Sequence, residues 1–318
     1  MAACRMSNIF HQHIPVLLKE TVDYLITSKD GIYIDATFGR GSHSKAILER
    51  LSAKGRLIAF DKDLDAVQFA KQYVHDARFS IVHTSFASMQ KILNELKVFG
   101  QIQGILFDLG VSSPQLDDDK RGFSFMREGT LDMRMDRSQD IDAKTLIQHS
   151  KEEDLAHIFW EYGEERFSRQ IAKAIITARA EKPITTTQSL ADIIKQAIPA
   201  SKRSHDKHPA TRCFLALRIA INHELSELEQ GLKQALDALT HGGRLGIISF
   251  HSLEDRIVKQ FIHHHEKGDQ PPRGLPIKGK IFNAKLKSIH KPIKPNEQEI
   301  RNNPRARSAI LRIAEKLS

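Results

Sequence analysis

The sequence has few of the residues that mark secreted or membrane proteins. Among 318 residues there are only two cysteines, Cys4 and Cys213, and one tryptophan. The cysteines lie in unlike contexts, so we expect no structural disulfide. The longest apolar run near the start, residues 14–18, contains a proline and is followed at once by charged residues. It predicts neither a signal peptide nor a membrane span, and we expect a cytoplasmic protein with no membrane partner.

Charge is plentiful and unevenly distributed. Lysine and arginine number 48 against 39 aspartate and glutamate residues, which gives a formal net charge of +9. The basic residues are concentrated in the last third of the chain, whereas acidic clusters lie at residues 117–119 and 152–154. This asymmetry favours one basic face suited to a polyanion, although charge alone does not distinguish a nucleic-acid partner from ordinary basicity.

The first 110 residues alternate β-rich runs with helical patterns, which is typical of a parallel sheet with crossover helices. We therefore predict a Rossmann-like α/β fold with a mainly parallel sheet. The expected strands are residues 31–36, 55–61, 79–83 and 105–108. The expected helices are residues 42–51, 64–74 and 88–96.

The pattern then changes to helices and polar loops without strands. We expect an all-helical domain over residues 117–215, inserted between two parts of the α/β domain, residues 1–116 and 216–318. The second part should contain one long amphipathic helix, residues 215–239, a buried strand, residues 242–250, and a final edge strand, residues 308–313.

A glycine-containing turn follows the first predicted strand. Asp35 ends the strand, Gly39 and Gly41 lie in the turn, and a helix follows, which places backbone N–H groups beside a ligand. Dinucleotide dehydrogenases share this pattern. However, Ser44 stands where their third glycine would be, and Asp35 would repel a pyrophosphate while attracting an ammonium group. The turn therefore favours S-adenosylmethionine.

Two further residues suit an adenosyl group. Asp61 ends the second predicted strand, where its carboxylate can accept hydrogen bonds from both ribose hydroxyls. Asp61 could instead cap the next helix, but Asp63 is better placed as that cap. Phe86 follows the third strand and could pack on the adenine, or it could belong to the core.

The fourth strand ends in a polar loop, residues 108–115, at the edge where doubly wound folds bind ligands. Asp108 is a candidate site residue, with a structural cap as the alternative. Ser112, Ser113 and Pro114 form a polar corner that can accept hydrogen bonds from an exocyclic amine during methyl transfer. These four are the candidate catalytic residues. A base methylated there must be unpaired or swung out of its stack.

Six motifs in this order resemble the bacterial ribosomal RNA small-subunit methyltransferase H family. The resemblance spans nearly the whole chain, and the order of the motifs makes it specific. The motifs are residues 35–43, 108–115, 122–125, 131–136, 208–212 and 248–256.

The resemblance implies a class I methyltransferase that methylates N4 of one cytosine in the decoding (P-site) region of 16S ribosomal RNA, with S-adenosyl-L-methionine as cofactor. It implies an inserted helical substrate-recognition domain and the ribosomal small subunit as the setting, and it leaves a homodimer open. The implied cofactor contacts are Gly41, Ser42, His43, Asp61, Phe86, Asp108 and Gln115, with Asp35 and Gly39 beside them.

The chain departs from the family pattern at one position and from the general amino-methyltransferase loop at another. Ser42 replaces the second glycine of Gly-Gly-His, so a backbone contact there requires a conformation that serine tolerates. Gln115 stands where the general loop has an aromatic residue, so a base would have to stack elsewhere, on Phe123 or Phe125.

Some motifs support either a functional or a structural interpretation. Arg134 could contact RNA or pair with a neighbouring aspartate, and Arg212 could contact phosphate or simply lie in a helix start. His251 follows a strand at the functional edge, but Ser252 and Glu254 of the same motif could equally serve as the cap and a first-turn charge of a helix. Residues 263–265 are consecutive histidines, which point about 100° apart on a helix, so we expect no metal site.

Three alternative functions remain open from the sequence. The first is an amino-methyltransferase acting on DNA or protein. The second is a nucleic-acid-binding protein that binds the cofactor without catalysis, and the third is a dinucleotide oxidoreductase. Substrate specificity and cofactor-dependent thermal stabilisation would separate them.

Overall fold

The computed structural model describes residues 15–204, 208–268 and 283–317. Cys4 and three of the basic residues in the last third, Arg273, Lys278 and Lys280, lie outside this part of the chain. In the described ranges no helix is both long enough and apolar enough to cross a membrane.

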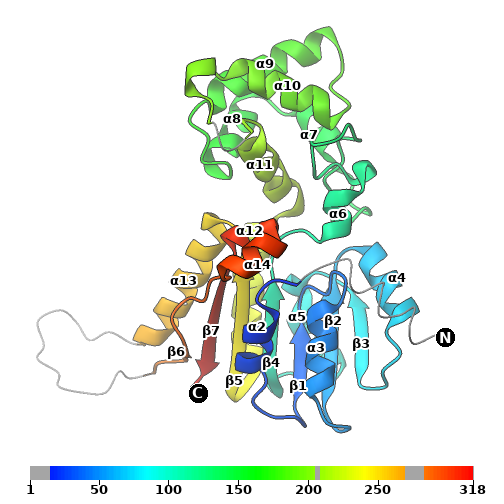
Figure 1. Cartoon of the computed structure of the whole chain (residues 1–318), viewed down its shortest axis with the longest axis vertical. Helices are drawn as coiled ribbons and strands as arrows, with labels where there is room; N and C mark the ends of the chain where they lie inside the picture. The colour runs from blue at the N-terminus through cyan, green and yellow to red at the C-terminus, as the bar shows by residue number, and fades with distance from the viewer. Residues whose placement is uncertain (1–14, 205–207, 269–282, 318) are drawn as a thin grey trace, which may run out of the picture. The chain divides into compact units, whose positions relative to one another are not determined.

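The chain divides into two compact units (Figure 1). The first, called the sheet unit here, comprises Met1–Gly110 and Leu225–Ser318. The second, called the helical unit, comprises Val111–Glu224. The domain boundaries predicted from the sequence lie after residues 116 and 215.

The sheet unit contains a seven-stranded sheet in the order β3-β2-β1-β4-β5-β7-β6. Strands β1 to β5 are parallel, whereas β7 is antiparallel to both β5 and β6. The predicted Rossmann-like, mainly parallel sheet is therefore confirmed. The strands are β1 (Ile32–Asp35), β2 (Arg56–Asp61), β3 (Phe79–His83), β4 (Ile102–Asp108), β5 (Leu239–Ser249), β6 (Leu286–Ser288) and β7 (Ile310–Lys316).

The prediction that the last strand lies at the edge of the sheet is wrong. Strand β7 pairs with β5 on one side and with β6 on the other, so β6 is the outermost strand. Strand β6 has only three residues, of which Leu286 alone is buried. Such a short segment carries no alternating pattern by which the sequence could reveal it.

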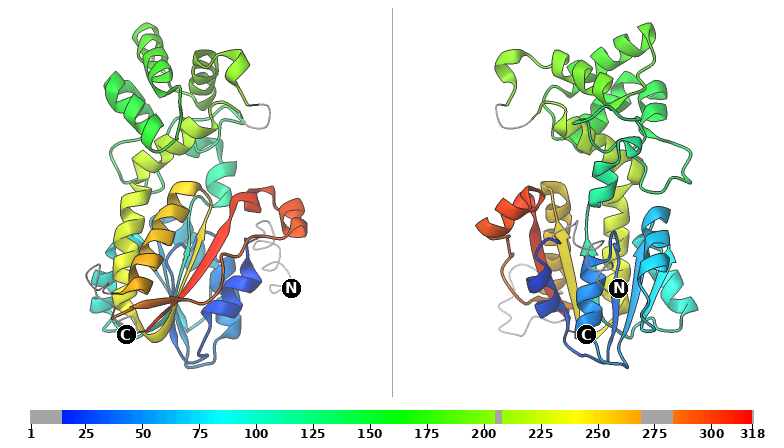
Figure 2. Two further views of the ribbon diagram at one scale, coloured as in Figure 1. Left: turned by 90° about the vertical axis from the view of Figure 1, so that its left-hand side faces the viewer. Right: turned by 45° about the vertical axis from the view of Figure 1, so that its right-hand side comes forward.

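Helices cover both faces of the sheet, which explains why its central strands are apolar on both sides (Figure 2). In β1, Tyr33 packs on the face covered by α2 and α3, and Ile34 packs on the opposite face with α5 and α12. The helices of this unit are α2 (Leu18–Leu25), α3 (Ser42–Arg50), α4 (Leu64–Tyr73), α5 (Met89–Glu95), α12 (Glu224–Ala238), α13 (Ser252–Lys267) and α14 (Glu297–Asn302).

The helical unit has its own apolar core, formed by residues such as Phe159, Ile175 and Leu217. The only strand-like pairing described in it is an isolated bridge between Thr130 and Thr186. Its helices are α6 (Ser113–Asp117), α7 (Ala143–His149), α8 (Glu152–Glu161), α9 (Ser168–Glu181), α10 (Thr187–Ala197) and α11 (Thr211–Asn222).

The single long helix predicted over residues 215–239 is wrong, because two helices occupy this stretch. Helix α11 ends at Asn222, since His223 adopts a left-handed conformation with φ of 53°, and α12 starts at Glu224. Histidine is one of the few residue types enriched in this conformation. The amphipathic pattern continues across the break, so apolar spacing alone does not reveal it.

The strand order reverses between β1 and β4. The chain passes from β1 outward through β2 and β3, then returns to place β4 on the other side of β1. In open α/β sheets the crevice at such a switch point, beyond the carboxyl ends of the strands, is where ligands bind. The loops after β1 and β4 therefore border the expected ligand-binding crevice.

Candidate cofactor site

The turn after β1 depends on two glycines in left-handed conformations. Gly39 has φ of 56° and Gly41 has φ of 74°. A Cβ at Gly41 would also lie 2.6 Å from the ring of Phe38, so a larger residue is excluded sterically as well. Ser42 is the first residue of α3 and has ordinary helical backbone, so the serine that replaces the family's glycine causes no strain.

Asp61 stabilises this turn from the end of β2. Its carboxylate accepts hydrogen bonds from the N–H groups of Gly39, at 2.7 Å, and Asp63, at 2.8 Å. Asp63 itself caps α4, as the sequence predicted. Burial raises the pKa of Asp61 to about 6, although the two backbone donors oppose this rise. Each carboxylate oxygen has a second lone pair, so the group can still accept from a ribose diol.

Asp35 is fully buried at the end of β1. It accepts a hydrogen bond from the Ser44 hydroxyl at 2.6 Å and one from the Thr37 N–H at 3.2 Å. Burial raises its pKa to about 7 despite these donors. Ser44 stands at the position of the third glycine of a dinucleotide fingerprint. Here its hydroxyl donates a hydrogen bond to Asp35, the acidic residue at the end of β1.

A pair formed by His43 and Asp108 joins α3 to the end of β4. Nδ1 of His43 lies 3.4 Å from Oδ2 of Asp108, and Nε2 lies 3.2 Å from the carbonyl of Val16. Burial alone would lower the pKa of His43, but the hydrogen bond and charge of Asp108, together with the charge of Asp35, raise it. Thr37 adds a second link, because its hydroxyl accepts from the Asp108 N–H at 2.7 Å. Thr37 was not among the site residues predicted from the sequence.

Phe86 lies in a short 3-10 helix after β3 and packs edge-on against Phe107 at a centroid distance of 5.2 Å. Gly231, in the middle of α12, makes room for it, because a Cβ there would lie 2.6 Å from the Phe86 ring. Gly231 was not among the site residues predicted from the sequence. A glycine inside an amphipathic helix costs about 1 kcal/mol relative to alanine, and that cost was the available signal.

The remaining predicted cofactor contact, Gln115, lies in the helical unit and is buried. Its side chain accepts from the Ser112 N–H at 2.8 Å, and Ser112 in turn forms the other half of a capping box at the start of α6. The candidate catalytic corner, Ser112, Ser113 and Pro114, is therefore the ordered first turn of this helix.

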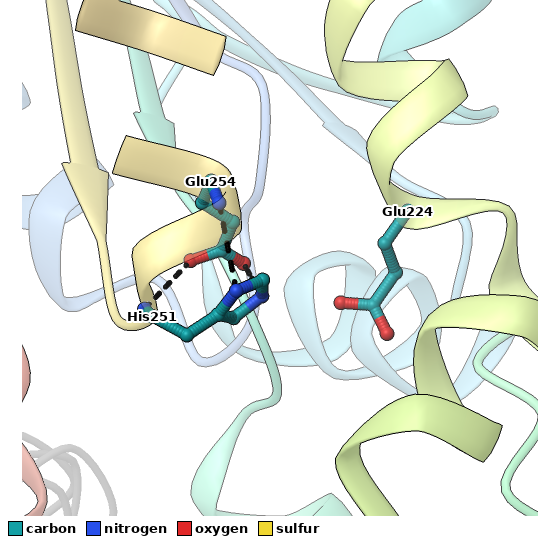
Figure 3. A group of neighbouring side chains, drawn as sticks. All are labelled: Glu224, His251 and Glu254. Carbon is teal, nitrogen blue, oxygen red and sulfur yellow. Dashed lines mark hydrogen bonds and ion pairs between the residues drawn. The ribbon is translucent and has the colours of Figure 1, made fainter. Parts of the chain in front are cut away.

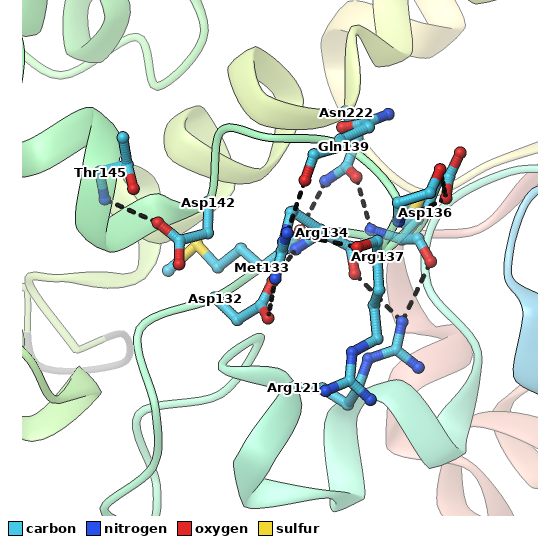
Figure 4. A network of polar contacts seen from close by, with 12 residues as sticks. Arg121, Asp132, Met133, Arg134, Asp136, Arg137, Gln139, Asp142, Thr145 and Asn222 are labelled. Carbon is cyan, nitrogen blue, oxygen red and sulfur yellow. Dashed lines mark hydrogen bonds and ion pairs between the residues drawn. The ribbon is translucent and has the colours of Figure 1, made fainter.

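Arg134 is held within the helical unit by a network of polar contacts (Figure 4). Nε and Nη2 of its guanidinium donate to the two oxygens of Asp132, at 2.8 and 2.9 Å. Nη1 donates to the carbonyls of Arg137 and Gln139. Of the two interpretations open for Arg134, the structure shows the ion pair with Asp132, and its contact with RNA stays a prediction.

The other predicted RNA contacts lie in contrasting surroundings. Arg212 is exposed, with Nη1 donating to the carbonyl of Glu164 at 3.1 Å. Phe123 is 8% exposed and belongs to the core of the helical unit, whereas Phe125 packs edge-on against Phe214. The surroundings of Phe123 therefore give no open face for a stacked base.

His251 and Glu254 form a capping box at the start of α13 (Figure 3). Nε2 of His251 lies 3.0 Å from the Glu254 carboxylate, which also accepts from the Phe250 N–H at 2.7 Å. Ser252, a possible cap from the sequence, is the first residue of the helix, and the cap is His251.

The sequence model of the MraW methylase family matches residues 10–317. The chain belongs to this family. It is a methyltransferase, and its methyl donor is S-adenosyl-L-methionine.

Curated relatives cover nearly the whole chain. Proteins named Ribosomal RNA small subunit methyltransferase H from Legionella pneumophila (strain Paris) and Coxiella burnetii (strain RSA 493 / Nine Mile phase I) are 54% and 55% identical to it. Each alignment covers 96% of this chain and 99% of the relative. A crystal structure of an rRNA methylase from Streptococcus thermophilus is similar at 14% identity and a TM-score of 0.43, covering 96% of this chain and 99% of that one.

The residues at the switch point fit the methyl donor of this methylase. Oδ1 of Asp108 and the hydroxyl of Ser42 are shielded from solvent and have no hydrogen-bond partner among the described residues. Buried polar atoms are normally paired, because leaving one unpaired costs about 1–3 kcal/mol. A polar ligand with donors at this edge of the sheet would satisfy both. The acidic set of Asp35, Asp61 and Asp108 also suits a ligand that carries a sulfonium and an ammonium group.

Gly231→Ala is expected to weaken binding of S-adenosyl-L-methionine about tenfold. The added methyl group would displace the Phe86 ring from its place against Phe107, even though alanine improves helix propensity. Isothermal titration calorimetry measures the change, and Glu229→Ala on the exposed side of α12 is the matched control. Equal affinities for the two variants would show that Phe86 is not part of the cofactor site.

Proposed function

We propose that this methyltransferase methylates N4 of one cytosine in the decoding (P-site) region of 16S ribosomal RNA, within the small ribosomal subunit and in the cytoplasm. The observation that carries the proposal is the 54% identity, across 96% of the chain, to a protein named Ribosomal RNA small subunit methyltransferase H. The six motifs found in the sequence support the choice of base and position by resemblance.

The proposed cofactor contacts converge on the ends of three neighbouring strands. Gly41, Ser42 and His43 follow β1, Asp61 ends β2 and Asp108 ends β4. Asp61 would hold the ribose, and Phe86 would pack on the adenine. Asp35 and Gly39 would lie beside these contacts and stabilise the site. Asp35 is fully buried. Gln115 stays a proposed contact.

In methyl transfer from this cofactor, the main role of these residues is to position the two reactants. S-adenosyl-L-methionine supplies a methyl group on an activated sulfonium, and the acceptor amine must approach it in line. An amine conjugated to a pyrimidine ring is a weak nucleophile, so hydrogen-bond acceptors on its N–H groups favour attack. Among the proposed catalytic residues, only the Asp108 carboxylate is basic enough to take the proton that the amine then loses. Ser112, Ser113 and Pro114 follow Asp108 closely in the chain and offer such acceptors. They are the proposed catalytic residues together with Asp108.

Among the predicted RNA contacts, Arg212 is supported best. It is exposed on the helical unit, and a guanidinium with accessible donors suits a phosphate group. Phe123, Arg134 and His251 are each held by contacts within the protein, so we propose that they act by shaping the surface that the RNA meets.

Transfer of labelled methyl groups to purified substrates tests the proposed function. We expect modification of small ribosomal subunits or their RNA, and mass spectrometry of the digested RNA should place the methyl group on N4 of a single cytosine. Preferential labelling of DNA or protein would overturn the substrate assignment. Binding of the cofactor without turnover on any ribosomal particle would instead support a non-catalytic, nucleic-acid-binding role.

A further inference from the structure

His43 lies in a buried position where both of its ring nitrogens face hydrogen-bond acceptors. Nε2 faces the carbonyl oxygen of Val16 at 3.2 Å, and Nδ1 faces a carboxylate oxygen of Asp108 at 3.4 Å. A neutral imidazole has one N–H group and one bare nitrogen, so it can satisfy only one of these acceptors. The imidazolium form, with two N–H groups, satisfies both.

The charges around His43 favour the same form. Asp108 at the end of β4 and Asp35 at the end of β1 are the two carboxyl groups that face it. On α14, the Glu299 carboxylate accepts from the N–H of Leu17, the residue that follows Val16 in the chain, at 2.7 Å. The side chain of His43 is only 6% exposed, so solvent screens these charges weakly.

The pair leaves Asp108 with one oxygen committed and one available. Oδ2 faces His43, and Thr37 holds the backbone N–H of Asp108. Oδ1 is shielded from solvent and has no partner among the described residues. Rotation of the carboxyl group would break the contact with His43, so the histidine determines where Oδ1 points.

We propose that His43 is a positioning residue that acts as a buried imidazolium and holds the Asp108 carboxylate with Oδ1 directed at the bound S-adenosyl-L-methionine. The inference rests on the proposed cofactor site and adds a role for the histidine side chain. In this arrangement the ring of His43 forms hydrogen bonds with Val16 and Asp108, and it affects cofactor binding through Asp108. Its charge also reduces the repulsion between the two carboxyl groups, Asp35 and Asp108.

Two variants of His43 separate its hydrogen bond from its volume. In His43→Asn the amide can still donate to Asp108, whereas His43→Leu fills similar space with no donor. We expect the dissociation constant of S-adenosyl-L-methionine to rise about tenfold in His43→Leu and about threefold in His43→Asn. The exposed His75, changed to asparagine, is the matched control and should leave the dissociation constant as in the wild type.

The protonation state gives a readout that a purely structural role would not move. In nitrogen-15 NMR spectra of the full chain, the His43 signals are identified by their loss in His43→Asn. We expect both ring nitrogens to stay protonated at pH 7.5, where histidines with an ordinary pKa of about 6.5 are mostly neutral. A neutral His43 at that pH, or wild-type affinity in His43→Leu, would overturn the proposal.

An Asp61→Ala variant measured alongside distinguishes failure of this inference from failure of the site. If Asp61→Ala weakens cofactor binding and His43→Leu does not, the site stands and the positioning role falls. If neither variant changes the affinity, the cofactor site itself has been placed wrongly.

Discussion

Asp61→Ala is expected to weaken binding of S-adenosyl-L-methionine about 100-fold. The carboxylate would accept both ribose hydroxyls, and hydrogen bonds to a charged group contribute roughly 1.5–3 kcal/mol. Two bonds at the lower end of this range correspond to about 3 kcal/mol, or a factor of roughly 100 or slightly more. The substitution also removes the acceptor of the Gly39 N–H, which loosens the turn that carries Gly41.

Isothermal titration calorimetry of the full chain measures this effect. Asp65→Asn, on the exposed surface of α4, is the control for a change of charge near the site. Asp61→Asn is informative where the alanine variant unfolds, because the amide keeps the shape but offers only one accepting oxygen. Unchanged affinity in both Asp61 variants would exclude Asp61 as the ribose ligand.

The affinity of the wild type should also depend on pH in the acid range. The ribose hydroxyls require the ionised form of Asp61, whose pKa in the free protein is about 6 because of burial. Affinity should therefore be constant above pH 7 and fall as the pH drops through 6, by about tenfold at pH 5. In Asp61→Asn this component of the pH profile should disappear, whereas an unchanged profile would assign the dependence to another group.

The sequence predicted the parts of the site that depend on strand ends. Asp35, Asp61 and Asp108 each follow an apolar run, and parallel strands bring their carboxyl ends to one edge, so the three acids were expected together. The contacts between these loops were not predictable. The bond from the Asp108 N–H to Thr37 joins residues 71 positions apart, and it depends on the register between β1 and β4.

Some parts of the fold could not be predicted because their residues show no periodic pattern of apolar positions that marks them. Strand β6 is too short for alternation, and the left-handed backbone of His223 divides an otherwise continuous helical pattern. Arg134 illustrates a different limit. Its motif is compatible with either an RNA contact or an ion pair, and only the folded loop shows that Asp132 and two carbonyls receive its donors.

Asp132→Ala is expected to destabilise the helical unit by roughly 3–5 kcal/mol, the usual cost of removing one partner of a buried ion pair. The side chain of Asp132 is 8% exposed and that of Arg134 is 19% exposed, so water cannot readily replace the lost carboxylate. The substitution would weaken other interactions of the loop besides the ion pair. The backbone of Met133, held at φ of 63°, and the main-chain bonds to Asn222 depend on the same conformation.

Denaturant unfolding of the full chain measures this cost, and hydrogen exchange over residues 131–222 localises it. Asp140→Ala, at an exposed position in the same loop, is the control and should change the unfolding free energy by less than about 0.5 kcal/mol. A loss below about 1 kcal/mol in Asp132→Ala would show that the carbonyls around Arg134 suffice to hold it.

The same pair predicts an acid-sensitive contribution to stability. Burial would raise the pKa of Asp132, but its hydrogen bonds with Arg134 and the charge of that guanidinium outweigh burial and lower it. A carboxyl group whose folded pKa lies below its unfolded value of about 3.9 stabilises the fold fully above that pH. The contribution is lost as the pH falls further through the folded pKa. The difference in unfolding free energy between the wild type and Asp132→Ala should therefore be constant from pH 5 to 8 and shrink below pH 4. A difference that persists undiminished at pH 2 would mean that packing of the loop, and not the ion pair, provides the stability.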